Sequence, residues 1–336
     1  MKRTIATIGL LGVCAMTLLV TGCSKKTVSV GTAAQPPLVD LETRRFELSG
    51  IAMEYAPSID RVTFFGPAPD GPNLLHVRDL DIPPAEDGSY RFYGGGYSWY
   101  APQKQWVGED GSTIQEWPPD PAMDRGPAET IAHSATTITV RNPVQWSGLQ
   151  QKKTLGVSGP ARAEVTYTLT NRGNVSRQAG TWINTGVFKR SLIAVRVPEG
   201  AEIYGWNDTA ADTLRSIMSE PMPGDDGEPT DWRFIDLKKA TWQGGIKVWI
   251  DAPGIEPEIA VYDDGYWFRR RVTTPNDGSA RAAGEGAVAI YIDPGAGLVE
   301  AELYGPVRTL TPGESVTTIE SWAIRRAPHA RAWLIP

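Results

Sequence analysis

The stretch Ala163-Glu-Val-Thr-Tyr-Thr-Leu-Thr170 alternates apolar and polar side chains. Successive side chains of a β-strand point to opposite faces, so this alternation is typical of a strand with one buried face. The segment Thr136-Thr-Ile-Thr-Val-Arg141 has the same period. Strands with one packed and one polar face are common in antiparallel sheets. Both segments therefore predict an antiparallel β-sheet.

The same alternation continues outward from these two segments in both directions. The further predicted strands are residues 46–55, 61–65, 192–197, 245–250, 258–262, 266–272, 287–292, 298–304 and 315–324. Turn sequences such as Asn171-Arg-Gly-Asn174 separate them, and helical periodicity is weak outside residues 208–218. The pattern predicts an all-β fold of antiparallel sheets with few short helices.

The N-terminus has the pattern of a bacterial export signal. Lys2-Arg3 precedes an apolar run over residues 5–20, which ends in Val20-Thr21-Gly22-Cys23. This end resembles the lipobox of bacterial lipoproteins, in which a peptidase cuts before the cysteine that carries the lipid. We therefore expect residues 1–22 to be a signal peptide and Cys23 to be lipidated. An ordinary cleaved signal or a short anchor is the alternative, although the run is shorter than the about 20 apolar residues of a spanning helix.

The lipobox resemblance implies a protein of the bacterial cell envelope, held to a membrane by lipid. Ser24 after the cysteine favours the outer membrane, facing the periplasm, by the sorting rule of bacterial lipoproteins. Residues 23–40 are rich in small and polar residues and are expected to form a flexible tether. Residues 41–336 are then a single globular domain.

Composition excludes several functional classes. The formal net charge is −6, which argues against nucleic-acid binding. Both cysteines, Cys14 and Cys23, precede the globular part, so a disulfide, a cysteine-bound metal or a thiol nucleophile is not expected there. We find no zinc motif, phosphate-binding loop or nucleophile elbow, and therefore expect no cofactor or metal.

Aromatic residues are concentrated in an irregular stretch, residues 90–121. All 12 tryptophans lie at or after Trp99, and Tyr97 and Gln103 are its neighbours. A sugar pocket needs aromatic walls for the C–H faces and a few polar groups for the hydroxyls. The alternative is that these rings form the sandwich core. Trp99 fits either interpretation, whereas Trp249 and Trp322 lie within alternating strands and are expected in the core.

Several blocks in order resemble the galactose mutarotase-like (aldose 1-epimerase-like) superfamily, in an uncharacterised lipoprotein branch. They are Met53-Glu-Tyr-Ala-Pro-Ser-Ile-Asp-Arg-Val-Thr-Phe-Phe65, Gly94-Gly-Gly-Tyr-Ser-Trp-Tyr-Ala-Pro-Gln103, Ser147-Gly-Leu-Gln-Gln-Lys152, Tyr167-Thr-Leu-Thr-Asn171 and Val299-Glu-Ala-Glu-Leu-Tyr-Gly-Pro306. The resemblance implies a β-supersandwich, a large antiparallel fold with a concave sugar-binding face.

The resemblance also implies site residues. In mutarotases a glutamate removes the proton of the anomeric hydroxyl and a histidine protonates the ring oxygen. Glu302 best matches the glutamate, and it shares a strand face with Glu300. The position matched to the histidine holds Arg172, which cannot act as a general acid. The expected sugar-binding residues are Tyr97, Trp99, Gln103, Gln150, Lys152, Asn171 and Arg172.

Three functional hypotheses follow. The first is a lipid-anchored envelope protein that binds a mono- or oligosaccharide on the concave face without mutarotase catalysis. The second is an enzyme acting at a sugar anomeric carbon, with Glu302 as base and an unidentified proton donor. The third is an envelope scaffold that binds a protein partner. His76, His133 and His329 lie outside mutarotase-like motifs and are expected to be structural or solvated.

Overall fold

A computed structural model describes residues 41–80, 92–114, 117–124, 126–224, 228–251, 257–273 and 285–332. The predicted signal peptide, Cys23 and the tether lie outside these residues. Among the described residues, no helix has the length and apolar character needed to cross a membrane.

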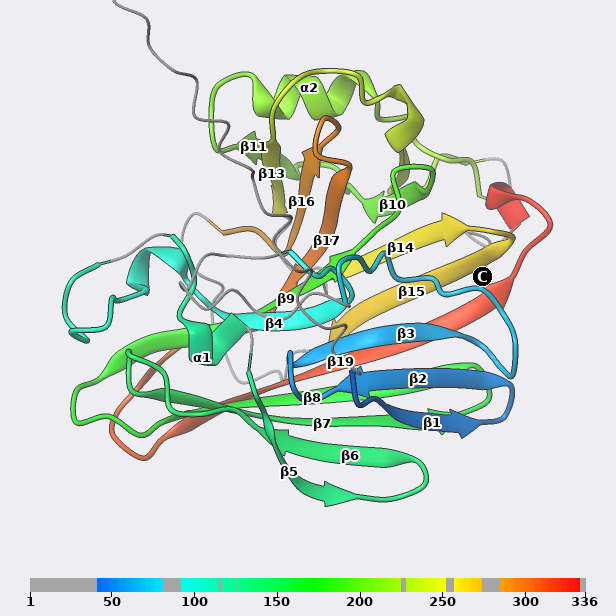
Figure 1. Cartoon of the computed structure of the whole chain (residues 1–336). Coiled ribbons are helices and arrows are strands. Elements are labelled where there is room, and N and C mark those ends of the chain that lie inside the picture. The colour runs from blue at the N-terminus through cyan, green and yellow to red at the C-terminus, as the bar shows by residue number, and fades with distance from the viewer. Residues whose placement is uncertain are drawn as a thin grey trace, which may run out of the picture. The chain divides into compact units, whose positions relative to one another are not determined.

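Two antiparallel sheets make up the fold (Figure 1). The first sheet has the order β1-β2-β3-β4-β9-β17-β16-β13-β11, with β18 paired to β9. Its strands are β1 (Arg44–Leu48), β2 (Ile51–Ala56), β3 (Arg61–Pro67), β4 (Gly96–Ala101), β9 (Arg177–Gly186), β11 (Glu202–Gly205), β13 (Ile246–Asp251), β16 (Val288–Asp293), β17 (Leu298–Tyr304) and β18 (Arg308–Leu310).

The second sheet has the order β12-β10-β14-β15-β19-β8-β7-β6-β5. Its strands are β5 (Glu129–His133), β6 (Thr137–Arg141), β7 (Leu149–Gly159), β8 (Arg162–Asn171), β10 (Leu192–Arg196), β12 (Trp232–Asp236), β14 (Glu258–Asp263), β15 (Tyr266–Thr273) and β19 (Ser315–Arg326). The described helices are short: α1 (Pro121–Asp124), α2 (Ala210–Ser216), and the 3₁₀ turns η1 (Gln103–Gln105), η2 (Leu237–Lys239) and η3 (Ala330–Ala332).

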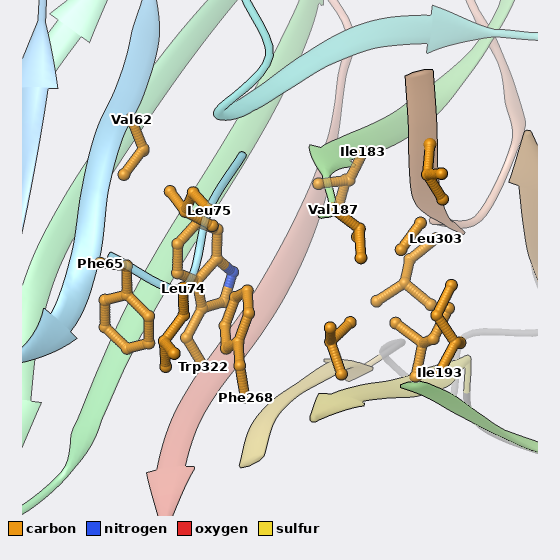
Figure 2. Packing of buried hydrophobic residues seen from close by; sticks show 14 of the residues in the cluster. Val62, Phe65, Leu74, Leu75, Ile183, Val187, Ile193, Phe268, Leu303 and Trp322 are labelled. Carbon is orange, nitrogen blue, oxygen red and sulfur yellow. The ribbon is translucent and has the colours of Figure 1, made fainter. Parts of the chain in front are cut away.

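The hydrophobic core lies between the two sheets. Figure 2 shows Phe65 and Leu303 from the first sheet with Phe268 and Trp322 from the second. Phe65 and Trp322 pack edge to face, with ring centroids 5.0 Å apart. Burial of apolar area from both sheets is the dominant favourable contribution to folding.

The fold confirms the sequence-based prediction of antiparallel sheets with few short helices. Residues 163–170, the first segment predicted to be a strand, lie within β8, and residues 208–218 contain α2. One detail differs, because residues 46–55 form the two strands β1 and β2 rather than one. The chain reverses at Ser49 and Gly50, whose φ angles of 50° and 87° are left-handed. Glycine adopts such a conformation without steric cost, which permits the tight turn.

Candidate functional site

The alternation within β17 determines which side chains reach the outer face of the first sheet. Val299, Ala301 and Leu303 belong to the core between the sheets. Because strand side chains alternate, Glu300 and Glu302 point to the opposite face. Their cross-strand neighbours occupy that face as well.

Residues that pair across neighbouring strands form three rows of side chains on this face. The first row is Trp99–Trp182–Tyr304 on β4, β9 and β17. The second is Tyr97–Asn184–Glu302–Ala289–Trp249, from β4 to β13. The third is Glu300–Tyr291–Lys247 on β17, β16 and β13. Segments far apart in the sequence therefore contribute to one surface.

A cavity of about 750 Å³ lies on this face. Its walls are mostly aromatic, with a few acidic, basic and amide groups. The lining residues are Trp99, Gln103, Lys104, Trp117, Trp182, Trp206, Lys247, Trp249, Glu285, Tyr291, Leu298, Glu300 and Glu302. A concave, largely apolar site with few convergent polar groups, within about 300–1,000 Å³, is typical of small-molecule binding.

Glu302 is fully buried at the base of the cavity. Its Oε2 accepts hydrogen bonds from Trp182 Nε1 at 2.8 Å and from Tyr304 OH at 2.9 Å. Lys247 Nζ lies 2.8 Å from the same oxygen. The other oxygen, Oε1, is buried and has no hydrogen-bond partner. A carboxylate fixed through one oxygen can use the other as an acceptor for a ligand hydroxyl or cation.

The Lys247–Glu302 ion pair spans the strand between them. Neighbouring strands lie about 4.8 Å apart, so the side chains must bridge β16 to meet. Ala289 is the β16 residue in register with both Glu302 and Trp249, and its short side chain leaves room for this contact. The Lys247 ammonium also lies 3.8 Å from the centre of the Trp182 ring. Such cation–π contacts stabilise a partly desolvated ammonium.

Trp182 is the centre of the aromatic wall. Its ring stacks on Trp106 and on Tyr304, with centroids 5.7 Å apart in each pair. Trp99 meets it edge to face at 4.9 Å. Trp99 in turn donates a 3.0 Å hydrogen bond from Nε1 to Asp124 Oδ1. Packing on several sides holds these rings in fixed orientations, so the wall is preformed.

Glu300 is the second carboxylate of the cavity. It accepts a hydrogen bond from the Tyr97 hydroxyl. Burial, followed by the nearby charge of Glu302, raises the pKa of Glu300 to about 7. The Tyr97 ring itself carries the Arg61 guanidinium 4.1 Å from its centre. Tyr97 therefore orients Glu300 from beneath the cavity rather than lining it.

Glu285 is the third carboxylate and precedes β16. Its Oε1 accepts a 2.7 Å hydrogen bond from the Gln103 backbone N–H. Its Oε2 is buried without a hydrogen-bond partner. Burial raises the pKa of Glu285. The hydrogen bond between Gln103 and Glu285 links the segment after β4 to the edge of the cavity.

The structure brings together some of the residues that the sequence predicted for the site. Trp99, Gln103 and Glu302 line the cavity, and Tyr97 contacts it through Glu300. The other four lie on or directly after β7 and β8 of the second sheet and do not line it: Gln150, Lys152, Asn171 and Arg172. Asn171 Nδ2 donates 2.8 Å hydrogen bonds to the Val175 and Leu310 carbonyls, which stabilises a turn.

Sequence reasoning missed several residues of this site. Trp249, expected in the core, lines the cavity, whereas Trp322 does lie in the core. Trp182 belonged to the family resemblance but was not selected as a site residue, and Lys247 carried no motif. Cross-strand register brings both to Glu302. Asn184, opposite Glu302, is fully buried and makes no hydrogen bond through its side chain. Buried polar groups without partners are rare in folded proteins.

None of the three histidines lines the cavity. His76 packs against Phe188 with ring centroids 5.1 Å apart, and burial lowers its pKa. His133 is exposed beside Phe46, and His329 is exposed near the end of the described chain. Within the described ranges, no group of three or more His, Cys, Asp or Glu side chains is arranged to hold a metal ion.

The sequence matches no protein-family model and no curated protein. Solved structures, however, are similar over most of the chain. A galactose mutarotase related enzyme from Lactobacillus acidophilus covers 86% of this chain and 99% of its own, at 12% identity and a TM-score of 0.50.

A galactose mutarotase-like protein from Lactobacillus casei covers 84% of this chain and 100% of its own, at 10% identity and a TM-score of 0.51. A protein from Synechocystis sp. covers 86% of this chain and 98% of its own, at 12% identity and a TM-score of 0.51. Likeness at this level of identity concerns the backbone alone. Together with the two antiparallel sheets, it identifies the architecture expected from the sequence blocks: the chain has the galactose mutarotase-like fold.

Proposed function

We propose that this protein is a lipid-anchored protein of the bacterial cell envelope that binds carbohydrate in the cavity on the outer face of the first sheet. The observation that carries the proposal is the composition of that cavity. Five tryptophans and a tyrosine form its walls, and three carboxylates, two lysines and an amide supply polar groups: Trp99, Trp117, Trp182, Trp206, Trp249, Tyr291, Glu285, Glu300, Glu302, Lys104, Lys247 and Gln103. Aromatic faces suit sugar C–H surfaces, and carboxylates accept hydrogen bonds from sugar hydroxyls.

Binding without mutarotase catalysis is the form of the proposal that the contacts favour. The glutamate–histidine mechanism needs a proton donor opposite the base. No histidine lines the cavity, and Glu302 Oε2 already accepts from three donors. These donors hold one oxygen of Glu302 in place, which suits the side chain to the role of a fixed hydrogen-bond acceptor.

Tryptophan fluorescence provides the test of sugar binding. The full chain is titrated with a panel of neutral hexoses, amino sugars, uronic acids and short oligosaccharides. We expect a saturable change with one class of sugar, because the ligand would alter the surroundings of the five cavity tryptophans. The control is Trp232→Ala, since Trp232 lies on β12 of the second sheet and does not line the cavity. A response that persists unchanged in Trp117→Ala would place binding elsewhere.

Lipid attachment at Cys23 is a separate part of the proposal and rests on the sequence alone. The substitution Cys23→Ser removes the thiol that would carry the lipid. We expect the variant to move from the membrane fraction to the soluble fraction when cells are fractionated. Continued sedimentation of Cys23→Ser with membranes would contradict the anchor and leave the sugar proposal intact.

A further inference from the structure

One side of the cavity already holds an ammonium group, that of Lys247. Its Nζ lies 2.8 Å from Glu302 Oε2, 3.8 Å from the centre of the Trp182 ring and 5.4 Å from that of Trp249. A carboxylate together with aromatic faces is the usual environment for a bound ammonium. The chain's own lysine therefore shows how this surface accommodates such a cation.

The rest of the cavity repeats these components. Glu285 and Glu300 supply carboxylates, and Trp117, Trp206 and Tyr291 supply aromatic faces. Within the described part of the chain, no lysine or arginine forms an ion pair with either carboxylate, whereas Glu302 has Lys247. Glu300 is only 8% exposed, and Glu285 Oε2 is buried without a hydrogen-bond partner.

The raised pKa values of these two carboxylates also favour a cationic ligand. Burial raises the pKa of both Glu285 and Glu300, so keeping them ionised costs free energy in the protein alone. An arriving cation would offset that cost. Neutral sugars offer only hydroxyls. An anionic sugar would bring its charge close to three glutamates, and of the two lysines in the lining Lys247 is already paired with Glu302.

We propose that the cavity selects an amino sugar with a free, protonated amine, whose ammonium binds one of the two cavity carboxylates that lack an ion-pair partner, Glu285 or Glu300, while its ring packs on the surrounding aromatic side chains. The proposal rests on the proposed carbohydrate binding and specifies its ligand class. N-Acetylation would weaken binding, because it removes the charge and adds bulk at the same atom. Lys247 remains paired with Glu302.

The two half-exposed tryptophans also fit this ligand. Trp117 and Trp206 are each 51% exposed and line the cavity. Trp117 packs edge to face on Trp99, and Trp206 packs on Tyr291, with centroids 6.0 and 5.8 Å apart. Rings held this way can stack on a sugar that enters from solvent.

Isothermal titration of the full chain with two matched series tests the proposal. The series are glucose, glucosamine, N-acetylglucosamine and glucuronic acid, and the four galacto counterparts. In one series, we expect the amino sugar to bind at least about tenfold tighter than its neutral and acetylated partners, which corresponds to about 1.4 kcal/mol. Added salt should narrow this difference, because the recognition is partly ionic.

Two isosteric variants assign the preference to residues. Glu300→Gln and Glu285→Gln each keep the shape and remove the negative charge, and the substitution at the carboxylate that binds the ammonium should lower the affinity for the amino sugar more than the affinity for the neutral sugar. Two positions are tested because one substitution could disturb folding. The matched control is Glu164→Gln, on the exposed face of β8 in the second sheet, which should leave the preference unchanged.

The outcomes separate this inference from the proposed function. Equal binding of neutral and amino sugars, or tighter binding of the uronic acid, would overturn the amino-sugar inference and retain carbohydrate binding. Preference for the amino sugar that survives both glutamine variants would also overturn it. Failure of every sugar to bind would overturn the proposed function and this inference together.

Discussion

Three carboxylates held in fully buried ion pairs and the three carboxylates that line the cavity differ in how their charges are compensated. Between the sheets, Asp60 pairs with Lys153 and Glu320 with Arg270, and beside Trp99 the Asp124 carboxylate pairs with Arg61. All six of these side chains are at most 2% exposed. Around the cavity, only Glu302 has an ion-pair partner among the described residues, while Glu285 and Glu300 have none.

The difference distinguishes a structural cluster from a binding site. Buried charges are tolerated in an interior when they are paired and hydrogen-bonded. The inter-sheet carboxylates also receive neutral donors, such as Asn142 Nδ2 to Asp60 at 2.7 Å and Tyr167 OH to Glu320 at 2.9 Å. Carboxylates that line a cavity and lack an ion-pair partner are where ligand recognition is expected.

The largest expected effect comes from breaking an inter-sheet pair. Glu320→Ala leaves the fully buried Arg270 guanidinium without its carboxylate. Removal of one partner of a buried pair costs about 3–5 kcal/mol, so the free energy of unfolding should fall by that amount. Urea denaturation measures it, with the exposed Glu164→Ala as control, expected within about 0.5 kcal/mol of wild type. A loss no larger than that of the control would mean that the interior does not depend on this pair.

The second largest expected effect is a gain in stability on substitution of Glu300, and its size depends on pH. Burial and the charge of Glu302 raise the pKa of Glu300 from 4.5 to about 7. Between these values the folded chain retains a proton that the unfolded chain has lost, so stability falls as the pH rises. At about 1.36 kcal/mol per pKa unit, the cost reaches about 3 kcal/mol above pH 7. Glu300→Gln removes this cost.

Thermal and urea unfolding at pH 4.5 and pH 8 measure that prediction. The glutamine variant should be more stable than wild type at pH 8, by about 3 kcal/mol, and its advantage should disappear at pH 4.5. Glu164→Gln is again the control, because that side chain is exposed on the second sheet. An advantage of equal size at both pH values would show that it does not arise from the ionisation of Glu300.

A smaller effect is expected at the rim of the cavity. Trp117→Ala or Trp206→Ala removes one stacking face from a half-exposed position. Sugar affinity should fall about tenfold, or about 1.4 kcal/mol, while the free energy of unfolding changes little. Titration calorimetry and urea unfolding separate the two quantities. Loss of stability in parallel with affinity would argue that these rings are structural.

The smallest effect is expected on the second sheet. Lys152→Ala changes an exposed side chain of β7 that does not line the cavity. Sugar affinity should change by less than about twofold, within the range of neutral surface substitutions. A competition titration against wild type resolves such a difference. A tenfold loss would indicate that the sugar binds on the second sheet and not in the cavity.

The sequence predicted the fold well because alternation is a local signal. Each strand of this protein carries its own period of two, as residues 163–170 and 298–304 do, and antiparallel pairing needs only short turns. The same period placed Glu300 and Glu302 on one face, and the structure has both at the cavity. The hairpin reversal at Ser49 and Gly50 was less evident, because both of its strands are short.

The site was harder to predict because it depends on register between distant strands. Lys247 and Glu302 meet across β16, and no local pattern encodes the offset between their strands. The alternation that marks Trp249 as half-buried is the same for a core face and for a cavity face. Arg172 and Lys152 were selected by block resemblance, which orders segments along the chain without placing them in space.

Saturation-transfer NMR on the full chain tests the central claim most directly. The ligands are the hexose, amino-sugar, uronic-acid and oligosaccharide panel, compared between wild type and the Trp117→Ala/Trp206→Ala double variant. We predict transfer to the ring protons of one sugar class in wild type, and a strong reduction in the double variant. Silence across the panel, or transfer that the double variant leaves unchanged, would contradict carbohydrate binding in this cavity.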